Sequence, residues 1–176
     1  MMRDGLILLV GFLLIVVQGA LGAVIDLGVL MPNPVLPIVI YLAMAPDVSL
    51  ARGAMLSFAL GVLFDSATGN SMGLFTFVLQ ASFLVARGAG FRLFMRSRLS
   101  QMAITAATAS AGSITLIALR SIFRKSSQID ISSPRYIAFA VIGSALSTGL
   151  LAPAIYQLVR RVDQLRRRDD AGAAVL

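Results

Sequence analysis

The sequence predicts an all-α integral membrane protein with six transmembrane helices, two of them short. Of its 176 residues, 58% are hydrophobic and only 13% are charged, and the mean hydropathy is +0.89. So few charged residues, gathered in a few clusters, cannot give a soluble domain its polar surface. The apolar stretches are long uncharged runs without alternating polar positions, which favours membrane helices over a β-barrel.

The absent residue types restrict the chemistry of the chain. It contains no Cys, His or Trp, and all eight acidic residues are Asp. This excludes disulfides, thiolate chemistry, zinc sites and His-based acid–base catalysis, and no span carries paired acids or a nucleophile with a base. We expect no enzyme activity, no cofactor and no metal. The net charge of +7 indicates a cytoplasmic membrane face and anionic lipid, not nucleic acid.

The first predicted span is long and the second is short. Residues 5–25 run without a charge and can cross a bilayer, and Gln18 within them needs an interhelical hydrogen-bond partner. A turn at 26–33 leads to an apolar run at 34–45 that opens with two prolines. Twelve helical residues cover only about 18 Å, so this span needs its flanks or a thinned, protein-lined place.

The third predicted span, 50–64, is short in the same way. It forms either a transmembrane hairpin or a re-entrant pair with the second span around residues 46–52, and hydropathy does not separate these cases. The fourth span is 71–89, with Ser71 as the predicted N-cap. Its one side-chain amide, Gln80, is an expected interhelical hydrogen-bond partner.

The last third of the chain begins with a surface segment. Residues 90–99 carry arginines between apolar residues at helical spacing, which predicts an amphipathic piece at the membrane surface. The fifth span, 100–119, is rich in Ala, Ser, Thr and Gly and suits a helix enclosed by other helices. The sixth span, 135–159, places Tyr136 and Tyr156 at the two membrane interfaces.

We therefore expect one six-helix transmembrane domain, residues 1–159, and a basic cytoplasmic C-terminal tail, residues 160–176. Six spans put both termini on one side. That side holds 11 of the 15 basic residues, all except Arg120, Arg124, Lys125 and Arg135 in the last loop, which assigns it to the cytoplasm. The arginines expected to contact lipid or the cytoplasm are Arg92, Arg96, Arg98, Arg160 and Arg161.

Small residues recur every fourth place between residues 53 and 73, and a carboxylate takes one place in the series. This spacing lays them along one ridge of a helix, where small side chains let membrane helices approach closely. We interpret the ridge as a packing surface between the third and fourth spans, as a face for a partner's helix, or as a ligand or ion site. Its members are Gly53, Ser57, Gly61, Asp65, Gly69 and Gly73.

Asp65 lies where the apolar run gives way to a predicted turn at 67–70. Three roles are open for its carboxylate: a solvated turn residue or helix cap, a partner for an arginine in a complex, and a proton-linked group. Carboxylates inside membranes are costly and tend to mark function. The position at a predicted surface favours the first role.

Four segments occur in a characteristic order between residues 33 and 98. They are an Asn-Pro pair before the second span, Arg-Gly-Ala at 52–54, GVLFDSATGNSMGLF at 61–75, and the arginine-rich segment after the fourth span. This order resembles the MreD family of bacterial rod shape-determining membrane proteins. Phe75 stands where that family often has a His, so a titrating residue is not expected there.

The resemblance implies a non-enzymatic scaffold of the cell-elongation machinery in the bacterial inner membrane. Such a protein would bind the single-span protein MreC and support peptidoglycan synthesis by RodA and its penicillin-binding transpeptidase, with MreB on the cytoplasmic side.

The resemblance also implies a fold similar to the S components of energy-coupling-factor vitamin transporters. This raises a second hypothesis, a subunit that binds a vitamin or other small molecule in a polar pocket. A transporter of lipid-linked intermediates is a third hypothesis, for which short spans without interior charge are poorly suited.

Overall fold

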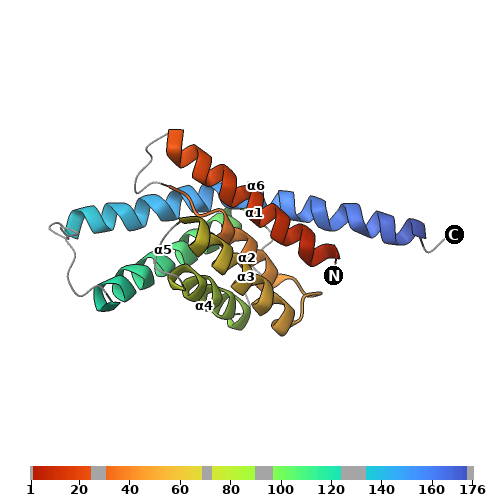
Figure 1. Cartoon of the computed structure of the whole chain (residues 1–176), viewed down its shortest axis with the longest axis horizontal. Helices are drawn as coiled ribbons and strands as arrows, with labels where there is room; N and C mark the ends of the chain where they lie inside the picture. The colour runs from red at the N-terminus through yellow and green to blue at the C-terminus, as the bar shows by residue number, and fades with distance from the viewer. Residues whose placement is uncertain (1, 25–30, 69–72, 90–96, 124–133, 174–176) are drawn as a thin grey trace.

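The computed structural model describes residues 2–24, 31–68, 73–89, 97–123 and 134–173, and these ranges contain six α-helices and no strand (Figure 1). The all-α prediction is therefore confirmed. The start of α1 and the end of α6 lie toward the same end of the bundle (Figure 1). The helices are α1 (Met2–Val24), α2 (Val35–Met44), α3 (Leu50–Thr68), α4 (Leu74–Gly88), α5 (Arg98–Phe123) and α6 (Pro134–Ala173).

Four of the described helices are long and apolar enough to cross a membrane. Their apolar segments are Asp4–Val24, Leu50–Thr68, Arg98–Leu119 and Ala138–Val162. The 10 residues of α2 and the 15 of α4 rise only about 15 and 22 Å, which is less than the bilayer core of about 30 Å. Two of the six expected spans are thus too short to cross unaided.

The boundary between α3 and α4 differs from the prediction. α3 continues to Thr68, into the predicted turn at 67–70, and the hydroxyls of Ser66 and Thr68 donate to carbonyls four residues earlier at 2.8 Å. The expectation that the third span is short was therefore wrong. α4 begins at Leu74 instead of after Ser71, because Gly73 has a φ of +97° that no α-helix contains. Ser71 itself lies outside the described residues.

The short helix α2 is the centre of the bundle. Nine of its ten residues are buried, and it contacts each of the other five helices. A helix surrounded by protein does not have to match the thickness of the bilayer, because other helices, not lipid, surround it. Of the two explanations for its shortness, the protein-lined place is the one that the structure shows.

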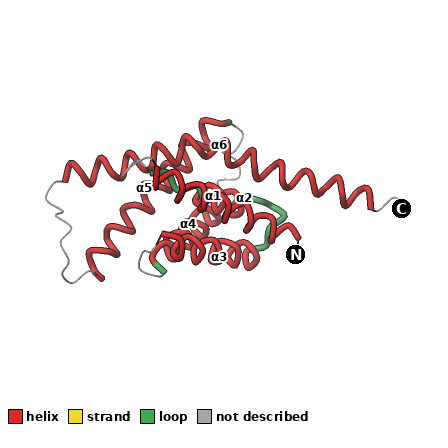
Figure 2. The backbone as a smooth tube through the Cα atoms, turned by 45° about the horizontal axis from the view of Figure 1, so that its top comes forward, coloured by secondary structure: helices red, strands yellow, loops and turns green. Residues whose placement is uncertain are grey.

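The longest helices, α5 and α6, pack against each other, and α3 and α4 lie side by side (Figures 1 and 2). Gly149 of α6 allows a close approach, since a Cβ there would lie 3.1 Å from the main-chain oxygen of Met102 and 3.1 Å from the Cβ of Ala106. Only 17% of the residues in the apolar segment of α5 are buried. The expectation that the fifth span is enclosed by other helices was wrong, because α5 packs mainly against α6 and its outer side is exposed.

Tyr156 is buried between helices of the bundle. Its side chain is 2% exposed, its hydroxyl oxygen lies 3.0 Å from that of Thr105, and its ring centroid lies 6.1 Å from that of Tyr41. Thr105 of α5 takes the place that water would have as hydrogen-bond partner of a tyrosine at a membrane surface, and the interface position of Tyr156 stays a prediction. The side chain of Tyr136 is not among those described.

Two surface segments are only partly described. Of the predicted amphipathic segment, residues 90–96 lie outside the described ranges, whereas Arg98 and Leu99 form the start of α5. α6 continues as a helix to Ala173 and extends beyond the bundle (Figure 2). The predicted C-terminal tail, residues 160–176, is thus helical as far as Ala173.

An ion pair joins the beginnings of α1 and α3. Nε and Nη2 of Arg52 donate to the two carboxylate oxygens of Asp4 at 2.8 and 2.9 Å. The geometry is bidentate, but the two side chains are 38% and 25% exposed. Its contribution to stability is therefore about 1 kcal/mol at most.

Gly61 provides a test of the contact between α3 and α4. A Cβ at this position would lie 2.6 Å from Cα of Thr76, which is backbone and cannot turn aside. We expect Gly61→Ala to lower the free energy of unfolding by about 1–3 kcal/mol, although alanine is the better helix former. The matched control is Gly19→Ala on α1, where a Cβ would meet nothing within 4 Å. Thermal unfolding in detergent measures both, and equal stability of the two variants would contradict this contact.

Candidate functional site

The ridge of small residues on α3 faces α4. A Cβ on Gly53 would lie 2.6 Å from the ring of Phe83, and the hydroxyl of Ser57 donates to Oε1 of Gln80 at 2.6 Å. The latter is the interhelical hydrogen bond expected for Gln80. Within this chain α4 covers the ridge, so these positions are not a free surface for another protein. The buried members are Gly53, Ser57, Gly61 and Asp65.

Asp65 is 3% exposed and accepts four hydrogen bonds from the start of α4. The donors are the main-chain N–H groups of Gly73 at 3.0 Å, Phe75 at 3.0 Å and Thr76 at 2.9 Å, and the Thr76 hydroxyl at 2.6 Å. The first N–H groups of a helix have no intrahelical acceptor, and the helix dipole favours a negative charge beside them. Asp65 is thus a helix cap supplied by a neighbouring helix, and the expectation that it lies at the surface was wrong.

Gly73, the last residue of the ridge, is required for its backbone conformation and not for close helix packing. Its φ of +97° lies in the left-handed region, which glycine adopts without the steric cost of a Cβ. It is exposed, and a Cβ there would meet nothing within 4 Å. Its N–H reaches Asp65, while its carbonyl accepts the first helical hydrogen bond, from Phe77 at 2.9 Å. Gly69 lies outside the described residues.

Two side chains cap α2. Oδ1 of Asn33 accepts hydrogen bonds from the N–H groups of Val35 and Leu36 at 3.1 and 3.3 Å. At the other end, the guanidinium of Arg87 donates to three main-chain oxygens at 2.8–3.3 Å. The Asn-Pro pair was a local signal for the first cap. The cap by Arg87 had no local signal in the sequence, because Arg87 lies about 40 residues away from the carbonyls of Ala43, Ala45 and Val48.

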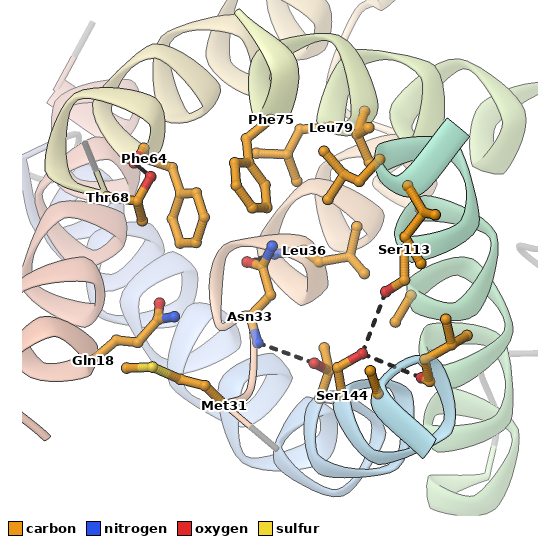
Figure 3. Close-up of a pocket in the computed structure, with 18 residues that line it drawn as sticks. Gln18, Met31, Asn33, Leu36, Phe64, Thr68, Phe75, Leu79, Ser113 and Ser144 are labelled. Atoms are coloured by element: carbon orange, nitrogen blue, oxygen red, sulfur yellow. Dashed lines mark hydrogen bonds between the residues drawn. The ribbon is translucent and has the colours of Figure 1, made fainter. Parts of the chain in front are cut away.

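A cavity of about 420 Å³ lies at the end of the bundle where α1, α3 and α5 finish and α2, α4 and α6 begin (Figure 3). Aromatic rings form part of its wall, where the centroids of Phe64 and Phe75 lie 4.8 Å apart in an edge-to-face arrangement. Phe75 is the residue that departs from the MreD pattern, and it contributes an apolar surface here. The polar lining residues are all uncharged: Gln18, Asn33, Thr68, Ser113, Ser144 and Thr148.

Most polar groups of the cavity already have partners. The hydroxyl of Thr148 accepts a hydrogen bond from the main-chain N–H of Asn33 at 3.0 Å, and the hydroxyls of Ser113 and Ser144 lie 3.3 Å apart (Figure 3). Oε1 of Gln18 is buried and has no hydrogen-bond partner among the described residues. The interhelical hydrogen bond expected for Gln18 is therefore not formed within the described part of the chain.

The arginines predicted for the cytoplasmic or lipid surface are only partly described. Arg98, Arg160 and Arg161 are exposed, whereas Arg92 and Arg96 lie outside the described ranges. The described residues contain no group of three acidic, His or Cys side chains that could hold a metal ion.

The capping by Asp65 leads to a prediction about stability. Asp65→Ala leaves three main-chain N–H groups at the start of α4 without their acceptor, and the one of Thr76 is buried, so we expect a loss of about 3 kcal/mol or more in the free energy of unfolding. Ser66→Ala is the matched control, because that hydroxyl is exposed and bonds only its own helix. Denaturation in detergent measures both, and a loss below about 1 kcal/mol for Asp65→Ala would show that the cap is dispensable.

Comparison with protein families gives one match. The family model described as rod shape-determining protein MreD matches residues 2–162, which include α1 to α5 and most of α6. No curated protein and no solved structure matches the chain, so the likeness to S components stays a prediction. With apolar helices long enough to span a bilayer and a match over nearly all of the bundle, the chain belongs to the MreD family of rod shape-determining membrane proteins.

Proposed function

We propose that this protein is a non-catalytic scaffold of the cell-elongation machinery, that it binds MreC, and that it supports peptidoglycan synthesis. The observation that carries the proposal is the family match over residues 2–162. RodA, its penicillin-binding transpeptidase and MreB are the further partners that this role implies. The charged groups Asp65 and Arg87 both cap helices, which supports a role in assembly over a role in chemistry.

We place the contact with the transmembrane helix of MreC on the outer face of α5. Ala103, Ala107 and Ala111 follow one another at a spacing of four and are all exposed. Small residues at this spacing allow helix backbones to approach closely in a membrane. The comparable ridge on α3 is covered by α4, whereas this one is open to a neighbour.

Ala107→Phe tests this placement. The phenyl group would stand where the backbone of a partner helix must lie, so we expect at least a tenfold lower recovery of MreC when the protein is purified from native membranes, which corresponds to about 1.4 kcal/mol. The amount of protein in the membrane should not change. Ala138→Phe is the matched control, because Ala138 is exposed on α6. Equal recovery with both variants would put the contact elsewhere, and failure of the unaltered protein to recover MreC would reject the scaffold role.

The proposed orientation places both termini in the cytoplasm. The start of α1 and the end of α6 share one end of the bundle (Figure 1), and positive charge is retained on the cytoplasmic side. A fluorescent-protein reporter fused after Leu176 should therefore fluoresce, and an alkaline phosphatase fusion at the same point should be inactive. Phosphatase activity would reverse the orientation.

A second candidate is a subunit that binds a vitamin or other small molecule. The specific observation in its favour is the cavity of about 420 Å³, since a scaffold by itself requires only a filled interior. The uncharged polar lining and the unpartnered Gln18 are features that a ligand would complete. A vitamin found in the purified protein would favour this candidate.

A further inference from the structure

A groove of about 430 Å³ runs between α1 and α6 on the outside of the bundle. Its walls come from apolar side chains of both helices and from Met31, Pro32 and Pro34 before α2. In a membrane this part of the surface faces lipid, because α1 and α6 both contain segments long enough to span the bilayer. The main apolar lining residues are Leu14, Val17, Leu21, Leu151, Ile155 and Leu158.

The groove adjoins the interior cavity. Gln18 and Met31 line both of them, and both side chains lie at the same side of the cavity in Figure 3. Cε of Met31 comes within 2.6 Å of the position that a Cβ on Gly22 would take, so the methionine lies close against the backbone of α1. A methionine side chain rotates easily. Between groove and cavity there is thus a movable apolar side chain and a side-chain amide.

The lining selects the chemistry of a ligand. Neither the cavity nor the groove is lined by any acidic or basic side chain among the described residues, and a charged group would be costly to bury there. The hydroxyls of Thr68 and Ser144 donate to carbonyls of their own helices, which leaves their oxygens as acceptors that call for a donor on the ligand, such as the O–H of a hydroxyl group. The Gln18 amide has a buried oxygen without a partner. A free hydroxyl group on the ligand, which both donates and accepts, fits this set.

We propose that the cavity and the groove form one site for an uncharged membrane amphiphile with a free hydroxyl head, of which diacylglycerol is the simplest example. The hydroxyl head lies in the cavity beside Gln18, and an acyl chain passes Met31 into the groove between α1 and α6. The site uses surfaces other than the α5 face assigned to MreC. A negative result for lipid binding would therefore leave the proposed scaffold role unaffected, and the reverse also holds.

The test is photo-labelling of the purified full-length protein with a diacylglycerol that carries a diazirine in one acyl chain. The comparison probe is a phosphatidic acid with the same chains, which differs by a charged phosphate in place of the hydroxyl. We expect at least tenfold more labelling by diacylglycerol, competition by unlabelled diacylglycerol, and labelled peptides from α1 and α6. Equal labelling by the two probes would overturn the proposal, because it would show ordinary lipid contact.

Two variants examine the two halves of the site. Ala154 is exposed and lines the groove, so Ala154→Phe should fill the groove and reduce labelling about tenfold, whereas Ala138→Phe on the same helix lines neither space and should leave labelling unchanged. Gln18→Leu should reduce labelling about tenfold through the lost hydrogen bond, yet raise the thermal stability of the empty protein by removing a buried amide oxygen that has no partner. Unchanged labelling in either Ala154→Phe or Gln18→Leu would refute the arrangement.

Two other occupants are distinguishable outcomes. If Ala154→Phe removed a co-purifying protein and left the diacylglycerol labelling intact, the groove would be a docking surface for a helix and the lipid proposal would be wrong. If denaturation of the purified protein released a water-soluble vitamin that blocked the labelling, the cavity would serve that ligand instead, and the proposal would again be wrong.

Discussion

The ends of the short helices impose the main physical constraint on this bundle. The first N–H groups and the last C=O groups of a helix have no partner within the helix, so the ends of α2 and α4, which have 10 and 15 residues, need acceptors and donors from elsewhere in the bundle. Asp65 satisfies the start of α4, while Asn33 and Arg87 satisfy the two ends of α2. These polar contacts fix where the short helices lie, and the apolar packing follows from their placement.

The contact between α3 and α4 shows how close packing and capping depend on each other. Gly61 has no side chain, so the backbone of α3 lies against that of α4 near Thr76. This proximity lets the Asp65 carboxylate, one helical turn later, reach the first N–H groups of α4. Without the small residues the helices would separate, and without the carboxylate the start of α4 would be unsatisfied.

The packing of five helices around the short helix α2 leaves a cavity in the bundle. α2 occupies the centre of the bundle, and a cavity remains beside its first turn, where the six helices come together without filling the interior. The chain belongs to a family of rod shape-determining proteins. A protein that acts only as a scaffold does not require a cavity of this kind. An uncharged amphiphile in the cavity and groove would complete the packing and link the protein to the composition of its membrane.

The sequence alone determined the helical membrane class, the family, and the helix face that carries Gly53, Ser57, Gly61 and Asp65, because hydropathy and four-residue spacing are local properties of the chain. Only the tertiary structure decided what those residues meet. The partners of Asp65 lie eight to eleven residues later in the chain, and the carbonyls that Arg87 caps lie about 40 residues earlier than Arg87. Burial of Tyr156, exposure of α5 and the unpaired amide of Gln18 depend likewise on which helices become neighbours, and no local pattern encodes that choice.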